Sequence, residues 1–202
     1  MTTTETLVAI IVPLAVILIL IAAGVWLLTR RRHLRERFGP EYDRAVGSGD
    51  GRMSAERELR SREKRHQELD IRPLPEKDRE RYAAEWQTTQ GRFVDDPGRS
   101  VGEADSLVTR LMKDMGYPTE GFEQRLKDLS VEHARTLEHY RDAHGVRLRS
   151  ADGRATTEEL RGAMVHYRAL FDELLGSSAD SPRREAHDDA RRDEGTERSD
   201  AV

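Results

Sequence analysis

The sequence predicts an all-α fold with one N-terminal transmembrane helix, polar juxtamembrane helices, a small helical bundle and a disordered C-terminal tail. Three observations predict this fold. An uncharged run begins at Leu7 and ends at Leu28, and several later segments space their apolar residues by three and four. No segment alternates apolar and polar residues as a half-buried strand does. Of the 202 residues 36% are charged and 5% are aromatic, so narrow seams between amphipathic helices fit better than a thick core.

The first element is a membrane anchor at residues 7–28, preceded by a short extracytoplasmic leader at residues 1–6. At about 1.5 Å per residue the anchor is about 33 Å long as a helix, which matches a hydrocarbon core of about 30 Å. A cleaved signal peptide is the alternative. However, the leader carries no Lys or Arg, and the run exceeds the roughly 7–15 apolar residues of a signal peptide. We therefore favour a retained anchor.

A basic cluster follows the anchor directly. By the positive-inside rule it places this end of the helix in the cytoplasm, in a single-pass protein of the cell membrane with its N-terminus outside. The cluster can also contact anionic lipid, at about 1 kcal/mol for each arginine. Setting the topology accounts for the arginines without lipid recognition, and we favour that interpretation. The five residues are Arg30, Arg31, Arg32, Arg35 and Arg37.

Residues 29–71 are predicted to form a basic juxtamembrane and polar helical linker. Apolar residues recur every four positions from Leu34 to Val46, and Gly39-Pro40 interrupts them. Ser54 then begins a highly charged helix whose apolar residues are Leu59 and Leu69. Such a helix is either solvated or packed along one narrow edge.

Residues 72–176 are predicted to form a helical cytoplasmic domain. Pro75 begins its first helix, and Ser100 and Glu103 have the spacing of a capping box that begins the second. Gly116 ends that second helix. The next helix starts near residue 122 and is capped again at Ser130.

The last helix of the domain has the most regular apolar stripe, with spacings of 4, 3, 4 and 3. The stripe consists of Leu160, Met164, Tyr167, Phe171 and Leu174. After Gly176, residues 177–202 contain no large apolar residue before Val202. That composition cannot offset the entropy of folding, so we predict a disordered tail.

Composition and motifs exclude several functions. The net charge of -4 argues against a nucleic-acid partner. The chain has no cysteine, which excludes disulfides, thiolate metal sites and a cysteine nucleophile. No phosphate-binding glycine loop is present, and no catalytic residue and no cofactor are predicted.

One segment, residues 148–159, resembles a calcium-binding EF-hand loop aligned on Gly153. Leu148 occupies its first position, where the loop needs a carboxylate, so too few oxygen ligands remain for calcium. A turn at Asp152-Gly153, followed by a capping box of Thr156 and Glu159, explains the same residues better.

Histidines gather in the C-terminal half and are candidate metal ligands: His133, His139, His144 and His166. His139 and His144 are five residues apart, which is the wrong spacing for one helical face, and a tetrahedral site would need His166 to converge on them. We favour surface or interhelical histidines. Trp86 and Phe93 could mark an exposed partner groove, but their helical spacing with Tyr82 favours a bundle core.

Three blocks carry a resemblance to known proteins: RERFGPEYDRAV, IRPLPEKDRERYAAEWQTTQGRFVDDP and EADSLVTRLMKDMGYP. With them the chain resembles a group of small single-pass bacterial membrane proteins that are common in actinobacteria. The resemblance covers most of residues 7–175 and implies only a layout, an anchor followed by a helical domain. It implies no activity and no site residues.

Two classes of function follow from these observations. The leading hypothesis is a membrane-anchored interaction or scaffold module, whose cytoplasmic helical domain binds a protein partner or self-associates beside the lipid bilayer. The alternative is a membrane-anchored enzyme or metal-binding sensor that uses the C-terminal histidines with Glu138 or Asp142. The apolar stripes of the domain, without a polar constellation suited to catalysis, favour the non-enzymatic hypothesis.

Overall fold

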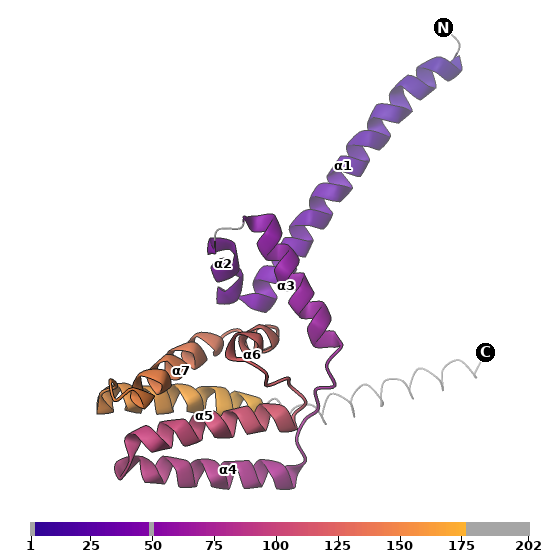
Figure 1. The fold of residues 1–202 in the computed structure, drawn as a ribbon. Coiled ribbons are helices and arrows are strands. Elements are labelled where there is room, and N and C mark those ends of the chain that lie inside the picture. The colour runs from indigo at the N-terminus through magenta and orange to yellow at the C-terminus, as the bar shows by residue number, and fades with distance from the viewer. Residues whose placement is uncertain (1–2, 49–50, 177–202) are drawn as a thin grey trace, which may run out of the picture. The chain divides into compact units, whose positions relative to one another are not determined.

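A computed structural model describes the backbone of residues 3–48 and 51–176 (Figure 1). It describes the side chains of the same residues except those of 3–13, 15, 23, 27 and 30. Every regular element in this part of the chain is a helix, which confirms the all-α prediction. The chain forms two compact units, Met1–Ser61 and Arg62–Val202. The predicted tail, residues 177–202, lies outside the described residues, as do the side chains of the predicted leader.

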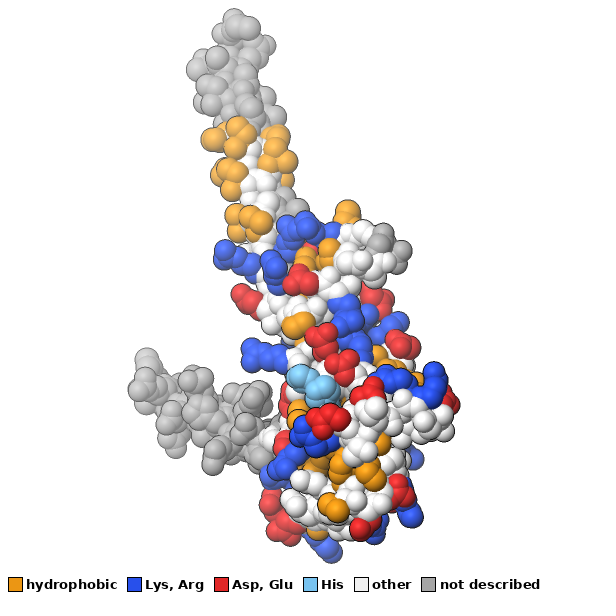
Figure 2. All heavy atoms as spheres, turned by 90° about the vertical axis from the view of Figure 1, so that its left-hand side faces the viewer, with side chains coloured by type: hydrophobic (Ala, Val, Ile, Leu, Met, Phe, Trp, Pro, Cys, Tyr) orange, Lys and Arg blue, Asp and Glu red, His pale blue; other side chains and the backbone are white. Residues whose placement is uncertain are grey.

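Helix α1 (Thr3–Phe38) contains the whole of the predicted membrane anchor. Ten large apolar side chains on it are exposed, from Val16 at 49% to Ile19 at 67%. On the face that Figure 2 shows, hydrophobic side chains lie along both edges of this part of the helix. A search of the described residues finds no helix that combines the length and the apolar character needed to cross a membrane, so the predicted transmembrane helix is not supported there. The predicted anchor at residues 7–28 includes side chains outside that description, those of 7–13, 15, 23 and 27.

The rest of the first unit is a small helical cluster. Helix α1 ends at Phe38 because Gly39 adopts a φ of 45° and Pro40 begins α2 (Pro40–Gly47), as the Gly-Pro break predicts. Helix α3 (Arg52–Gln67) contributes Ala55 and Leu59 to the packed side of the cluster. The charged helix therefore packs along one narrow edge, which was one of the two predicted arrangements. The buried apolar residues of this cluster are Leu34, Phe38, Tyr42, Ala55 and Leu59.

The second unit is the predicted helical bundle. It contains α4 (Glu76–Gly91), the 3-10 helix η1 (Arg92–Val94), α5 (Pro97–Asp114), α6 (Phe122–Leu129), α7 (Leu137–Ala151) and a last helix at residues 157–176. Figure 1 shows α4 and α5 side by side and antiparallel, joined by the short η1 connection. Antiparallel packing follows from this connection, because a short link between two helices leaves no room for a crossover.

The core of the bundle contains the residues that the apolar spacing predicts. All five stripe residues of helix 157–176 are buried, with exposed fractions from 0% to 7%. Trp86 is 3% exposed and stacks on Phe171 at 4.8 Å between ring centroids, so the core interpretation of Trp86 is confirmed. Phe93 is partly buried and packs against the same core.

Several helix boundaries differ from the predictions. Helix α3 begins at Arg52, not at Ser54, and α4 begins at Glu76 with Pro75 as its N-cap. Helix α5 begins at Pro97, not at Ser100, because the Asp96 carboxylate caps it by accepting the Arg99 N–H at 3.1 Å. Turns separate α6 from α7, with Ser130 following the end of α6. There the Ser130 hydroxyl donates to the Lys127 carbonyl at 2.6 Å, which satisfies one of the last free carbonyls of α6.

Gly116 ends α5 at the predicted position and has a second role. Its φ is 98°, and a Cβ at this position would lie 2.2 Å from the carbonyl oxygen of Asp70. Beside it, the Arg72 N–H donates to the Met115 carbonyl at 2.8 Å. Only glycine therefore allows the segment before α4 to pass so close to the end of α5.

Candidate functional site: the groove between α4 and α5

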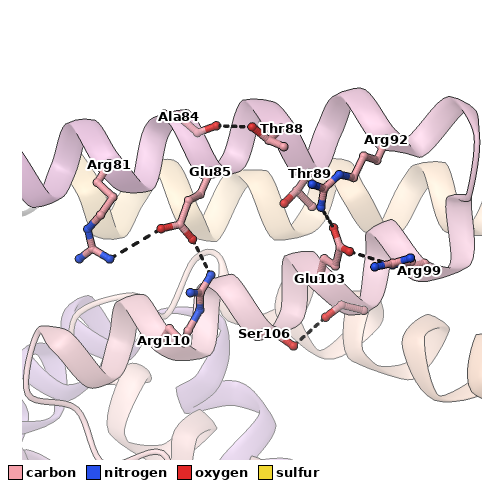
Figure 3. A pocket seen from close by; sticks show the side chains of 11 residues that line it. Arg81, Ala84, Glu85, Thr88, Thr89, Arg92, Arg99, Glu103, Ser106 and Arg110 are labelled. Atoms are coloured by element: carbon pink, nitrogen blue, oxygen red, sulfur yellow. Dashed lines mark hydrogen bonds and ion pairs between the residues drawn. The ribbon is translucent and has the colours of Figure 1, made fainter.

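A groove of about 790 Å³ runs between α4 and α5 (Figure 3). Its volume lies within the range of small-ligand sites, roughly 300–1,000 Å³. Long charged side chains form its two ends, and small residues form the part between them. The lining residues are Arg81, Ala84, Glu85, Thr88, Thr89, Arg92, Arg99, Gly102, Glu103, Ser106 and Arg110.

The floor of the groove exists because each helix presents two small residues one turn apart. These are Ala84 and Thr88 on α4, and Gly102 and Ser106 on α5. The Thr88 hydroxyl donates to the Ala84 carbonyl at 3.0 Å, and the Ser106 hydroxyl donates to the Gly102 carbonyl at 2.9 Å. A Cβ added to Gly102 would meet no atom within 4 Å. The floor is thus open, and its hydroxyl protons are already used within each helix.

At one end of the groove, Glu85 lies between two arginines. Its Oε2 accepts a hydrogen bond from Arg110 Nη2 at 2.6 Å, and its Oε1 lies 3.6 Å from Arg81 Nη1. Arg110 reaches across from α5, whereas Arg81 lies one turn before Glu85 on α4. Arg81 Nη2 also lies 3.0 Å from Asp78 Oδ1 and 3.7 Å from Asp114 Oδ2, so this end holds two further acids beside the groove.

The other end repeats this arrangement with the two helices exchanged. Glu103 Oε1 accepts from Arg99 Nε at 3.0 Å, one turn earlier on α5. Glu103 Oε2 accepts from Arg92 Nη1 at 3.1 Å, which reaches across from the end of α4. Figure 3 shows the two Arg–Glu–Arg groups at opposite ends of the groove.

The repetition is encoded in the sequence. The pattern R-x₃-E-x₆-R begins at Arg81 and again at Arg99, eighteen residues later, with a small residue before each Glu and Thr or Ser three after it. Two antiparallel helices that carry one pattern are related by an approximate two-fold axis through the middle of the groove. A capping box of Ser100 and Glu103 accounts for these residues one helix at a time and does not predict this site. The repeated pattern was the signal that identifies it.

The groove lining contains four arginines and two glutamates, a formal charge of +2 that the carboxylates of Asp78 and Asp114 beside Arg81 offset. Each guanidinium has five N–H donors, so donors remain after the pairs with Glu85 and Glu103 are made. The side chains of these arginines are 48% to 73% exposed, and such exposed pairs contribute only about 0–1 kcal/mol each to stability. The groove contains no Cys, His or Lys, and its chemistry is suited to anion binding.

The predicted basic cluster is partly engaged within the first unit. Arg31 Nε lies 3.7 Å from Glu56 Oε1, and Arg35 Nη2 lies 3.6 Å from Asp43 Oδ1. Arg31, Arg32 and Arg35 line a cavity of about 330 Å³ with residues of α2 and α3. Arg37 is exposed, and the side chain of Arg30 lies outside the described residues. Arg31 and Arg35 therefore already have carboxylate partners within this unit.

The four candidate histidines do not converge on one point. His133 is buried, with Nδ1 at 2.9 Å from Glu173 Oε1 and Nε2 at 3.3 Å from the Tyr117 hydroxyl. His144 stacks on Phe122 at 3.7 Å between ring centroids, and burial lowers its pKa from the ordinary value. The rings of His139 and His166 do meet, at 4.7 Å. Within residues 3–48 and 51–176, no group of three or more His, Asp or Glu side chains is placed to hold a metal ion.

The loop resembling an EF-hand has the predicted alternative structure. Helix α7 continues to Ala151 and Gly153 has a φ of 68°, which makes the predicted turn. The Thr156 N–H donates to Glu159 Oε2 at 2.8 Å, and the Glu159 N–H donates to Thr156 Oγ1 at 3.3 Å. This capping box lowers the pKa of Glu159 to about 2, with a further contribution from Arg149.

Comparison of the chain with protein-family models, with curated proteins and with solved structures found no match. What this site does must therefore be argued from its own residues.

Proposed function

We propose that this chain is a membrane-anchored binding module, in which α1 attaches the protein to a lipid bilayer and the helical bundle binds a partner beside it. The single observation that carries this proposal is the surface of α1, where ten large apolar side chains between Leu14 and Leu28 are exposed. Exposed apolar areas of this extent mark a membrane or protein interaction. The bundle, in contrast, buries its own apolar residues and leaves a charged groove.

A bilayer suits this surface better than a protein groove does. The exposed side chains include consecutive residues from Val16 to Ile21, so they point to all sides of the helix. A helix that is apolar all round belongs in an environment that is apolar all round. Our proposal extends the bilayer contact toward residue 7, over side chains outside the described residues.

The orientation that we propose places the N-terminus outside the cell and the bundle in the cytoplasm. Arginines begin within two residues of Leu28, and a positive flank of this kind is retained on the cytoplasmic side. Trp26 is 56% exposed near the same end, as is typical of residues at the level of the lipid headgroups. The partner itself is a second part of the proposal, and the groove is the surface that we assign to it below.

The absence of cysteine makes a direct topology test possible. Two single-cysteine variants, Thr4→Cys and Glu158→Cys, would be expressed in bacterial cells and treated with a membrane-impermeant maleimide. Glu158 is a suitable reporter of the bundle because its side chain is 75% exposed. We expect Thr4→Cys to be labelled in intact cells, and Glu158→Cys to be labelled only after the cells are permeabilised.

Fractionation of the same cells tests attachment separately. We expect the chain to stay in the membrane pellet after an alkaline carbonate wash and to be released only by detergent. Release by the wash alone would contradict a spanning anchor. Labelling of both cysteines in intact cells would contradict the proposed orientation while leaving attachment in place.

A further inference from the structure

We propose that the groove between α4 and α5 is a docking site for an acidic helical segment of a protein partner, one that carries two carboxylates seven residues apart. This inference rests on the proposed function of a binding module. It adds the chemistry of the partner and the surface of the bundle that the partner binds. The juxtaposition that carries the inference is the pair of Arg–Glu–Arg groups at the two ends of an open floor of small residues.

Charge selects an acidic partner. At one end Arg92 and Arg99 share the single carboxylate of Glu103. At the other end Arg81 is already paired with Asp78 and Asp114 as well as Glu85, so Arg110 is the arginine there that is placed to bind a further carboxylate. The glutamates hold the arginines in place in the free protein and leave their unused N–H groups available to a ligand.

The spacing selects a helix. On each of the two helices, seven residues separate the glutamate at one end from the arginine at the other, from Glu85 to Arg92 and from Glu103 to Arg110. Seven residues correspond to about 10.5 Å along a helix axis. A third helix that lies along the groove presents residues i and i+7 on one face at the same separation, with i+3 and i+4 between them over the floor.

The floor permits a helix to approach closely. Ala84, Thr88, Gly102 and Ser106 are all small, and a Cβ at Gly102 has open space. Small residues allow helix axes to come together, and the arginine side chains on either end are long enough to reach the partner's carboxylates. The approximate two-fold symmetry has a consequence here, because a helix with two equivalent acids can dock in either direction.

The test is a binding measurement on the full chain in detergent micelles. The probe is a fluorescent alanine-rich helical peptide with Glu at positions i and i+7, measured by anisotropy. One control peptide replaces both Glu by Gln, and another places the two Glu at i and i+4. We expect both controls to bind at least about 10-fold more weakly, and we expect the probe's affinity to fall as salt is raised.

Two protein variants separate docking from a purely structural role of the ion pairs. In Glu85→Gln/Glu103→Gln the arginines lose their internal acids, and we expect the probe to bind several-fold more tightly. Gly102→Leu fills the floor without removing a charge, and we expect at least about a 10-fold loss of binding. The matched control is Gly162→Leu on helix 157–176, where a Cβ also has open space, and we expect no change in binding. Circular dichroism of each variant establishes that it is folded.

Weaker or equal binding of the probe by Glu85→Gln/Glu103→Gln, once folded, would overturn the proposal, as would equal binding of the two Glu spacings. Binding that appears only after residues 177–202 are deleted would assign the groove to the chain's own C-terminal segment and overturn a protein partner. Because the measurement is made in detergent, its failure is independent of membrane attachment. Conversely, release of the chain by the carbonate wash would leave this result unaffected.

Discussion

Helix α1 and helix 157–176 are both rich in large apolar residues, but α1 exposes these side chains whereas helix 157–176 buries them. The stripe of helix 157–176 is at most 7% exposed, whereas the ten apolar side chains on α1 are about half exposed or more. The difference lies in where the residues fall around the helix. Spacings of 4 and 3 collect them on one face that neighbouring helices cover, whereas an unbroken apolar run surrounds the helix and no bundle of this size covers every side. The angular distribution of apolar residues therefore decides whether the chain buries them by itself.

The same substitution in the two helices tests this difference most strongly. Leu170 is fully buried and Leu18 is 59% exposed, so we expect Leu170→Ala to lower the free energy of unfolding of the bundle by about 2–5 kcal/mol. Leu18→Ala should change it by less than about 0.5 kcal/mol. Denaturant unfolding of the chain in detergent would be followed by fluorescence. With Trp26→Phe as the background, Trp86 in the bundle core is the one tryptophan left. Equal losses from the two substitutions would contradict the comparison.

A charged substitution on α1 should affect membrane attachment and leave the stability of the bundle unchanged. Leu18→Arg places a cation in the proposed membrane segment, at a cost of about 2.5–3.5 kcal/mol for insertion at a helix centre. We expect less of this variant in the carbonate-washed membrane pellet and no change in the unfolding of the bundle. The matched control is Val165→Arg, at a residue 58% exposed on helix 157–176, which should alter neither measurement. Retention of Leu18→Arg at the wild-type level would argue that the bilayer does not surround this residue.

The buried stripe of helix 157–176 also makes a polar contact through Tyr167. The Tyr167 hydroxyl donates to Asp105 Oδ1 at 2.9 Å, and the Asp105 side chain is only 13% exposed. We expect Tyr167→Phe to lower the free energy of unfolding by about 1–3 kcal/mol, because it removes a donor from a buried carboxylate. Tyr82→Phe is the control. Its hydroxyl donates at 2.6 Å to Asp114, which is 46% exposed and can be rehydrated, so we expect a smaller loss. If Tyr82→Phe lowered the free energy of unfolding more than Tyr167→Phe, the exposure of the acceptor carboxylate would not explain the loss of stability.

The smallest effect is a pH dependence confined to the bundle. Burial lowers the pKa of His144 below its ordinary value of 6.5, with Arg147 adding to the shift and Asp105 opposing it. The unfolded chain then binds the proton more readily. The stability that depends on neutral His144 is therefore fully present above pH 6.5. It is lost as the pH drops from 6.5 through the pKa of His144 in the folded state.

For one proton the slope is at most about 1.4 kcal/mol per pH unit. We expect His144→Gln to flatten the unfolding free energy between about pH 5.5 and 7, above the range in which carboxylates titrate. Membrane retention of the wild-type chain should not change over the same range. An unaltered slope in His144→Gln would assign the pH dependence to another group.

Much of the bundle could be predicted from local patterns. The stripe from Leu160 to Leu174, the Gly39-Pro40 break and the end of α5 at Gly116 each follow from one rule about apolar spacing or backbone conformation. The start of α5 could not be settled in this way. Asp96-Pro97 and Ser100-Glu103 both carry start signals, and the Asp96 side chain, which accepts the Arg99 N–H, decides between them.

The groove shows why a site made of surface charges is harder to predict. Arg and Glu four residues apart stabilise an isolated helix, so Arg81 with Glu85 and Arg99 with Glu103 resemble ordinary solvated pairs. What turns them into a site is the pairing across two helices, from Arg110 to Glu85 and from Arg92 to Glu103. The histidines show the reverse case. His139 and His166 meet in space although 27 residues separate them, but no third ligand is placed with them in the described part of the chain.

The sequence by itself determined the helical class, the apolar run that we assign to the membrane, and most helix ends, because these depend on residues within a few positions of one another. Tertiary structure alone decided which charged side chains face each other across α4 and α5. Antiparallel packing brings into contact residues that are 11 to 25 positions apart, such as Arg92 with Glu103 and Glu85 with Arg110. A local pattern cannot specify such a contact, because it depends on how two helices are packed and not on either helix alone.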